Sequence, residues 1–206
     1  MPKVVDPAAR RRELAKAVWR VVRRDGLDHA SVRRVAREAG LSMGSLRHYF
    51  ATQSELMVFA MRVIIDRIEG RIAALDAEAD VRRRAERVLA ELLPMDAERR
   101  AENEVWLAFT ARAMVDPELA AVRDEGYDKL REGCRVLVGE LADVGRAESD
   151  LELATDHLHA VLDGLAVHAA MRPDLSPPER ISAVIARHLD ALKMAPPRPT
   201  RRRRRR

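Results

Sequence analysis

The sequence has few aromatic residues and a single cysteine. Only 3% of its 206 residues are aromatic, two Trp, two Tyr and three Phe, so a cage of several rings around a quaternary ammonium ligand is not expected. Cys134 falls on an apolar stripe with Leu130 and Leu137, a pattern that indicates a buried thiol in a reducing compartment. The fold is therefore predicted to rely on packing rather than on disulfides.

The chain also lacks long apolar runs and strand patterns. No stretch approaches 18 apolar residues, and the N-terminus is polar and charged, so neither a membrane span nor export is expected and a cytoplasmic location is predicted. Ala, Leu, Arg and Glu are abundant, while Gly and Pro fall mainly between periodic segments. These features predict an all-α fold of about nine helices, and 47% hydrophobic content suffices for a packed core.

Motifs for catalysis and metal binding are missing as well. The sequence contains no Gly-rich phosphate loop, no Gly-x-Ser-x-Gly elbow and no Cys-His pairing in a recognisable context. His157, His159 and His168 do not share one helical face, so they are not expected to converge on a metal ion. We expect a protein that is not an enzyme and that holds no cofactor and no metal.

Charge divides the chain into three parts. Residues 1–50 hold 12 Lys and Arg against five Asp and Glu, whereas residues 51–200 hold 20 against 28. A basic N-terminal segment before an acidic one favours nucleic-acid binding by the first. The Pro- and Arg-rich residues 195–206 end in six arginines and are predicted to be disordered, either as a solvated tail or as an arm that binds phosphates nonspecifically.

Residues 31–50 have the pattern of a helix, a sharp turn and a second helix. Ser31 is a suitable N-cap for the first helix, Gly40 a suitable end to it, and Ser42 a suitable cap for the second helix. Three residues of the second segment fall at i, i+3 and i+4 and can face inward: Leu46, Tyr49 and Phe50. An ordinary corner between two helices is the alternative, but the basic charge favours a helix-turn-helix unit that reads DNA.

The exposed side of the second helix is small and basic, so it can enter the major groove of DNA. The residues predicted to lie near base edges are Met43, Gly44, Ser45, Arg47 and His48. Those predicted to lie near phosphates are Ser31, Arg33, Arg34 and Tyr49, and Ser42 belongs to the same interface as the cap of the reading helix.

These motifs resemble the N-terminal domain of the TetR family of bacterial transcriptional regulators. The resemblance covers Leu14 to Leu56, including Asp25-Gly26-Leu27, the run REAGLSMGSLRHYF and Phe50-Ala51-Thr52-Gln53-Ser54-Glu55-Leu56. Gln53 stands where the family usually has Lys, at a position that the resemblance assigns to DNA. Further along, Leu92 to Asp96 and Glu104 to Phe109 resemble the BetI-like branch.

The resemblance implies a helix-turn-helix domain over residues 1–52 and a helical effector-binding and dimerisation domain over residues 53–194. The function that it implies is that of a homodimeric regulator of double-stranded DNA, expected to be a repressor that binds a pseudo-palindromic operator and is released by a small apolar effector. A ligand-independent DNA-binding regulator or architectural protein is one alternative. A helical adaptor that never touches DNA is another, and the basic head argues against it.

The resemblance also implies residues for the effector and for the dimer. The expected effector-binding residues are apolar or aromatic, with Arg112 and His168 as polar partners: Met61, Ile65, Trp106, Phe109, Arg112, Tyr127 and His168. The alternative for the Trp and Phe side chains is ordinary core packing. The expected dimer residues lie on the last two helices, near residues 149–171 and 177–192: Leu158, Val161, Leu162, Leu165, Ile181, Val184, Ile185 and Leu189. Burial of these residues within one subunit is the alternative.

Overall fold

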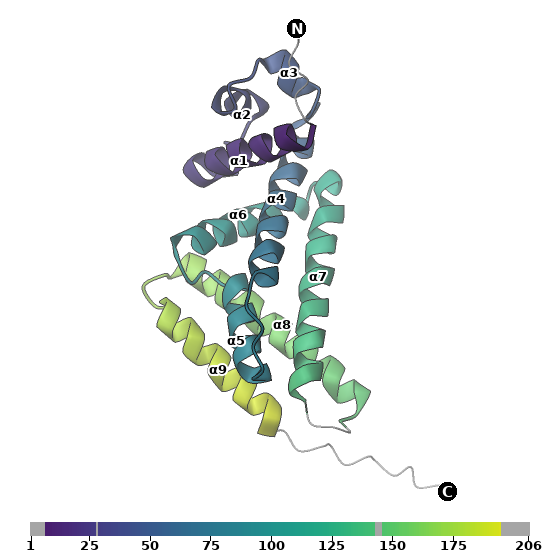
Figure 1. Cartoon of the computed structure of the whole chain (residues 1–206), viewed down its shortest axis with the longest axis vertical. Helices are drawn as coiled ribbons and strands as arrows, with labels where there is room; N and C mark the ends of the chain where they lie inside the picture. The colour runs from purple at the N-terminus through teal and green to yellow at the C-terminus, as the bar shows by residue number, and fades with distance from the viewer. Residues whose placement is uncertain (1–6, 28, 143–145, 195–206) are drawn as a thin grey trace, which may run out of the picture. The chain divides into compact units, whose positions relative to one another are not determined.

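The computed structural model describes residues 7–27, 29–142 and 146–194, and these residues form nine α-helices and no strand (Figure 1). The helices are α1 (Pro7–Asp25), α2 (Val32–Glu38), α3 (Met43–Arg47), α4 (Gln53–Ala73), α5 (Val81–Leu92), α6 (Ala97–Ala113), α7 (Pro117–Leu141), α8 (Glu148–Met171) and α9 (Pro178–Met194). The prediction of an all-α fold with about nine helices is confirmed. None of the described helices is both long and apolar enough to cross a membrane. The predicted tail, residues 195–206, lies outside the described residues.

Short polar side chains cap three helices, at Ser31 and Ser42 as the sequence predicts and at Thr52 before α4. The side chains of Ser31, Ser42 and Thr52 accept hydrogen bonds from the backbone N–H three residues further on, at 3.3, 3.0 and 3.0 Å. Each cap satisfies a donor that the first turn of a helix leaves without a partner. Gly26 follows α1 with a φ of 81°, and Gly40 lies in the turn after α2 with a φ of 64°. Both angles belong to the left-handed conformation that favours glycine.

The chain packs as two compact units. The first unit contains α1 to α4, α6 and the start of α7, through residue 127, and the second contains α5, the rest of α7, α8 and α9. Helices α1, α2 and α3 together are called the reading head below. Helix α4 belongs with the reading head because its apolar side continues the core that α1 begins. The boundary predicted at residue 52 divides a DNA-binding segment from an effector-binding segment, and it does not coincide with the division between the two compact units. It stays a prediction.

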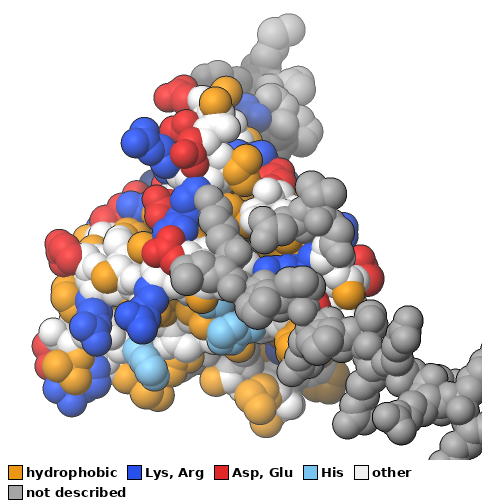
Figure 2. All heavy atoms as spheres, turned by 90° about the horizontal axis from the view of Figure 1, so that it is seen from below, with side chains coloured by type: hydrophobic (Ala, Val, Ile, Leu, Met, Phe, Trp, Pro, Cys, Tyr) orange, Lys and Arg blue, Asp and Glu red, His pale blue; other side chains and the backbone are white. Residues whose placement is uncertain are grey.

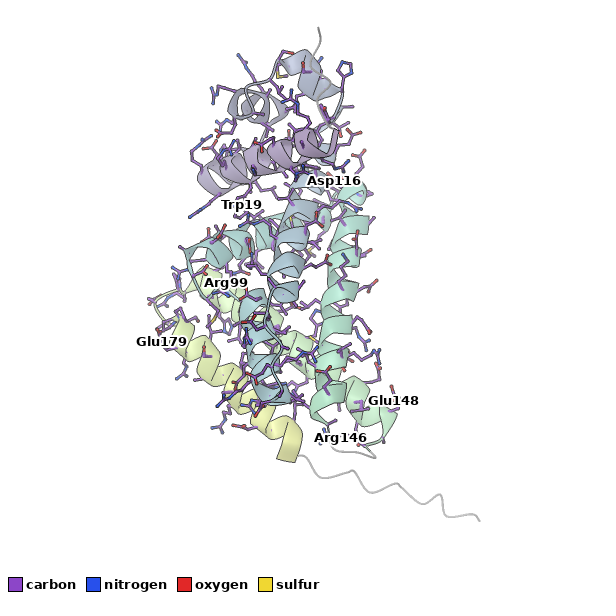
Figure 3. All side chains as sticks on the ribbon, in the orientation of Figure 1. Trp19, Arg99, Asp116, Arg146, Glu148 and Glu179 are labelled. Carbon is purple, nitrogen blue, oxygen red and sulfur yellow. The ribbon has the colours of Figure 1, made fainter. Side chains whose placement is uncertain are left out.

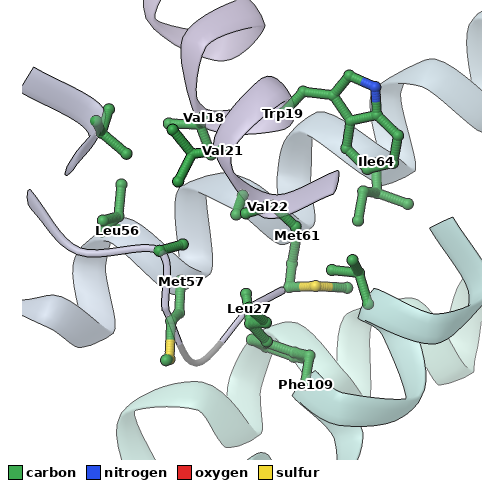
Figure 4. Close-up of a cluster of buried hydrophobic side chains, with 14 of the residues drawn as sticks. Val18, Trp19, Val21, Val22, Leu27, Leu56, Met57, Met61, Ile64 and Phe109 are labelled. Atoms are coloured by element: carbon green, nitrogen blue, oxygen red, sulfur yellow. The ribbon is translucent and has the colours of Figure 1, made fainter. Parts of the chain in front are cut away.

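The core of the first unit joins α1 to α4 and α6 (Figure 4). The apolar side of α1 faces this core, because four of its side chains are at most 1% exposed: Leu14, Val18, Val21 and Val22. Leu46 and Phe50 are also buried, but Tyr49 is 46% exposed, so the prediction that it faces inward is wrong. Tyr49 and Phe50 both lie beyond the end of α3 at Arg47, where Phe50 turns into the core while Tyr49 lines a surface pocket.

The core of the second unit is lined by α5, α7, α8 and α9. Cys134 of α7 is buried there, as predicted, with Leu137 and Leu141, and Leu130 packs partly buried against the same core. Burial raises the pKa of the Cys134 thiol to about 12, because a low-dielectric surrounding disfavours the thiolate. Cys134 is therefore an unreactive core residue rather than a nucleophile.

Five of the predicted dimer residues are buried by their own chain. Their exposed fractions are 4% or less: Leu158, Leu162, Ile181, Ile185 and Leu189. They pack in the same cluster as Ala85 and Leu89 of α5 and the apolar stripe of α7, so they present no surface to a second subunit. The prediction that these five form the dimer interface is wrong. Val161, Leu165 and Val184 are only partly buried and remain candidates.

Candidate nucleic-acid interface

Helix α3 exposes nearly all of its side chains. Of its five residues only Leu46 is buried, and this side chain anchors the helix on the core of the first unit. The residues predicted to approach the base edges are all exposed: Met43, Gly44, Ser45, Arg47 and His48. Helix α3 is therefore presented as a short ridge with one positive charge, at Arg47, and a ridge of this shape fits the major groove.

Two serines shape the N-terminal end of that ridge. The hydroxyl oxygen of Ser42 accepts the backbone N–H of Ser45 at 3.0 Å, and the two hydroxyl oxygens lie 2.9 Å apart in a hydrogen bond of their own. This second bond uses one of the two hydroxyl protons. The other proton remains available to an acceptor on a base or a phosphate.

The predicted phosphate neighbours differ in their ion pairs. Arg34 lies 3.3 Å from the Asp25 carboxylate, so a phosphate near Arg34 would compete with that carboxylate. Asp25 also pairs with Arg24, and the hydrogen bond from Arg24 contributes most to lowering the pKa of Asp25. Arg33 and Arg47 are exposed, and within the described ranges no carboxylate lies at ion-pair distance from either. A phosphate near Arg33 or Arg47 would therefore not compete with a carboxylate of these described residues.

A second ion-pair group connects α1 to α2, and the sequence pattern did not predict it. Glu38 accepts from Arg20 at 2.7 Å and from Arg24 at 3.0 Å, and these guanidinium groups lower the pKa of its carboxyl. The pairs join residues 14 and 18 positions apart on different helices, so helical periodicity could not identify them. They orient α2 on α1 and so help to position the interface.

Gln53 binds the protein itself. Its side-chain amide donates a hydrogen bond to the backbone carbonyl of Ala30, in the turn before α2. This bond ties the start of α4 to the reading head, a role that the resemblance did not suggest. Contact of Gln53 with a phosphate stays a prediction, as do the DNA contacts of Ser31, Ser42 and Tyr49.

The predicted effector-binding residues separate into a clustered set and an exposed set. Met61, Ile65 and Phe109 are buried in the core of the first unit, and Trp106 packs against it with its ring centroid 6.4 Å from that of Phe109. A Cβ atom on Gly126 would lie 2.3 Å from the Trp106 ring, so the indole lies directly against the backbone of α7. These four side chains are therefore brought together by α4 and α6.

The remaining polar candidates are not part of the buried core of the first unit. Arg112 and Tyr127 are exposed in the first unit, and His168 is exposed in the second. His157 packs edge to face on His188 with ring centroids 4.8 Å apart, and His159 lies 3.6 Å from the Asp163 carboxylate. Within the described residues, no group of three or more His, Cys, Asp or Glu is arranged to hold a metal ion.

The first unit also has an open surface pocket of about 270 Å³ that sequence reasoning did not predict. Its walls include the aromatic rings of Tyr49, Phe50 and Phe59, and Arg11 lies over the Phe59 ring at 5.5 Å. Residues from α1, α4 and α7 meet there, which no single periodic pattern reveals.

Known proteins with similar sequences and structures are transcriptional regulators. Residues 81–193 match the profile of the domain described as "BetI-type transcriptional repressor, C-terminal". The chain is 37% identical to the HTH-type transcriptional regulator PksA of Bacillus subtilis (strain 168) over an alignment 207 positions long, which covers 98% of this chain and 99% of that protein.

Solved structures give the same result. A transcriptional regulator from Rhodococcus sp. RHA1 is 32% identical with a TM-score of 0.76, over 88% of this chain and 95% of that one. The multidrug binding protein EbrR, solved in complex with imidazole, is 30% identical with a TM-score of 0.66, over 95% of both chains.

The chain therefore belongs to the TetR family of transcriptional regulators, with a C-terminal domain of the BetI type. The predicted family and branch are confirmed, and so is the function of a DNA-binding transcriptional regulator. Because the family consists of regulators, the prediction that the chain is not an enzyme is also confirmed.

Proposed function

We propose that this regulator is a repressor that binds a pseudo-palindromic operator as a homodimer, in the cytoplasm, and that a small apolar molecule releases it. The observation that carries the proposal is the exposed basic ridge of α3, anchored by the buried Leu46. Arg47 and His48 are suited to hydrogen-bond base edges, while Arg33 is suited to a phosphate. Two such heads related by a twofold axis would read half-sites about one helical turn or a multiple apart.

The outer side of α8 supports the homodimer. Leu153 and Met171 are 57% and 74% exposed, and their separation of five helical turns places them on one side of α8. Ala160 and Gly164 lie between them and are small enough to let a second helix approach closely. We call Leu153, Ala160, Gly164 and Met171 the outer stripe of α8, and propose it as the contact surface in place of the buried residues.

Exposed hydrophobic side chains are also visible in the space-filling view. On the face shown in Figure 2 they lie among histidine and arginine or lysine side chains. Exposed apolar side chains that gather on one surface are typical of an interface between proteins.

The clustered effector residues support release by a ligand. Met61, Ile65, Trp106 and Phe109 form an apolar environment where α4 and α6 meet, and EbrR, a relative with 30% identity, was solved with a small molecule bound. Helix α4 runs from this cluster to the reading head. A ligand that displaces α4 would therefore alter the distance between the reading heads of the two subunits. To move the population from 1:99 to 99:1 a ligand must favour the released state by about 5.5 kcal/mol.

A specific observation also favours the ligand-independent alternative. Met61 and Phe109 are fully buried among core side chains, as in a body that has no room for a ligand. A thermal-shift screen with a library of apolar and cationic compounds distinguishes the two. Stabilisation by at least one compound that also weakens DNA binding supports the ligand-released repressor, and a library without effect supports the alternative.

Selection from a random duplex pool tests DNA recognition directly. The purified protein should recover sequences with twofold symmetry, and analytical ultracentrifugation should show a dimer that binds them. Recovery of asymmetric sequences by a monomer would contradict the homodimeric part of the proposal. Reporter transcription from a promoter carrying the selected site then determines the sign of regulation.

A further inference from the structure

A buried carboxylate on α6 holds two arginines of α4. Glu102 is 3% exposed and accepts from Arg67 Nε at 2.9 Å. Arg71 binds the same carboxylate through two nitrogens, at 3.0 and 2.7 Å. A carboxylate removed from water is costly unless charged donors satisfy it, and Arg67 and Arg71 together supply those donors to Glu102.

Arg67 makes two further contacts, and together these contacts fix its guanidinium. One terminal nitrogen donates to the Glu98 carboxylate, and the guanidinium carbon lies 4.9 Å from the centre of the Trp19 ring. A guanidinium is planar, so carboxylates that fix its plane also fix the surface that it offers to an aromatic ring. Arg67 therefore connects Trp19 of α1 to Glu102 of α6.

Trp19 lies on the side of α1 that meets α4, next to Ile64 in the close-up (Figure 4), and it is labelled on α1 in Figure 3. It is 8% exposed. The residue that follows, Arg20, belongs to the ion pairs that join α1 to α2 through Glu38. The other buried side of α1 packs with Leu46 of α3 in the same core, so the position of α1 determines the position of the reading helix.

We propose that Arg67 is a positioning residue for DNA recognition. Held by Glu102 and Glu98, it stacks on Trp19 and sets the orientation of α1, and with it α2 and α3, relative to α4 and α6. Arg67 does not touch DNA in this role. A displacement of α6 would move the Glu102 carboxylate, and the movement would reach the reading head through Arg67. The proposal depends on the DNA-binding function of the family and not on any particular effector.

The test compares Arg67→Met with Arg62→Met on the same helix. Arg62 is exposed and pairs with Glu125 at 3.3 Å, so its loss removes the same charge from α4 without touching Trp19 or Glu102. Both variants keep most of the apolar side-chain length.

At a temperature where both are fully folded, Arg67→Met should bind a duplex recovered by selection about tenfold more weakly than Arg62→Met, which corresponds to about 1.4 kcal/mol. Arg67→Lys should restore only part of the affinity, because an ammonium cannot stack and bind in the same planar manner. Equal affinities of the two Met variants would overturn the proposal.

A second measurement does not depend on DNA. The chain has two tryptophans, Trp19 and Trp106, so Trp106→Phe leaves Trp19 as the fluorophore. In this background Arg67→Met should change the emission maximum and the acrylamide quenching of Trp19, whereas Arg62→Met should leave both unchanged. If the selection recovers no duplex, the sequence-specific function fails, and this spectroscopic comparison still decides whether Arg67 holds Trp19.

A mutant cycle tests the connection itself. Trp19→Leu and Glu102→Gln should have non-additive effects on urea unfolding in the presence of Arg67, and additive effects in the Arg67→Met background. Non-additivity that persists without Arg67 would show that Trp19 and Glu102 interact by another route, which contradicts the proposal.

Discussion

Helices α3 and α8 both carry an apolar and a polar side, but their apolar sides are covered differently. Helix α3 is five residues long and buries only Leu46, so its polar side projects from the protein. Helix α8 is 24 residues long and buries Leu158 and Leu162 in its own unit, while Leu153 remains exposed on the outer stripe. The comparison shows that an apolar pattern identifies the side of a helix that must be buried. Whether that side is buried within the subunit or against a second subunit depends on how the neighbouring helices pack.

Two substitutions on α8 test that comparison with the largest expected effect. Leu162→Arg places an unpaired charge in the core of the second unit, and should lower the free energy of unfolding by roughly 4 kcal/mol or more. Ala160→Arg lies two residues away on the exposed side and should leave the unfolding of the subunit nearly unchanged while it prevents dimer formation. Urea unfolding and analytical ultracentrifugation measure the two effects. A monomeric, unfolded Ala160→Arg protein would show that this side is not separate from the core.

Arg47→Ala tests the exposed side of α3. If Arg47 hydrogen-bonds a base edge, the substitution should cost about 1 to 3 kcal/mol of binding free energy on the best selected duplex. It should cost much less on random duplex, and should not alter the melting temperature because the side chain is exposed. Fluorescence anisotropy with both duplexes provides the comparison. Equal losses on the two duplexes would assign Arg47 to a phosphate instead.

The buried His188 should make the second unit sensitive to acid. Burial lowers the pKa of His188 below its ordinary value of 6.5, and the neighbouring His157 lowers it further by a smaller amount. Below about pH 6.5 the unfolded chain therefore binds a proton that the folded chain does not bind, so the free energy of unfolding falls as the pH falls. Between pH 7 and pH 8 this group should have no effect.

Urea unfolding from pH 8 to pH 5 measures this dependence, with His188→Gln as the control. The variant should lose less stability on acidification than the wild type. Identical pH profiles would mean that His188 is protonated as readily in the folded chain as in the unfolded one.

Gln53→Lys should have the smallest effect. A lysine at the start of α4 adds one positive charge beside the reading head, and contact with one further phosphate would steepen the slope of log K against log salt by about 0.9. The substitution also removes the amide that donates to Ala30, so unfolding should be measured in parallel. An unchanged salt slope would place residue 53 away from the DNA backbone, in agreement with its observed bond to Ala30.

Local patterns predicted the parts of the site that depend on a single helix. The caps at Ser31 and Ser42, the turn at Gly40 and the exposure of Arg47 all follow from spacing within a few residues. Such features are set by backbone hydrogen bonding and by which side of a short helix is apolar, both of which neighbouring residues determine. Tyr49 is an exception: it lies beyond the end of α3, where the tertiary packing turns Phe50 into the core and leaves Tyr49 in the wall of the surface pocket.

The sequence alone was sufficient for the helical class of the fold, the helix-turn-helix segment and the family, because each depends on residue type at short, fixed spacing. The tertiary structure alone decided that Leu158 and Leu162 belong to the subunit core, that Gln53 binds Ala30, and that Arg67 lies between Trp19 and Glu102. These contacts join helices that are distant in the chain. Their formation depends on how whole helices pack, and a periodic pattern along one helix contains no information about the helix that will cover it.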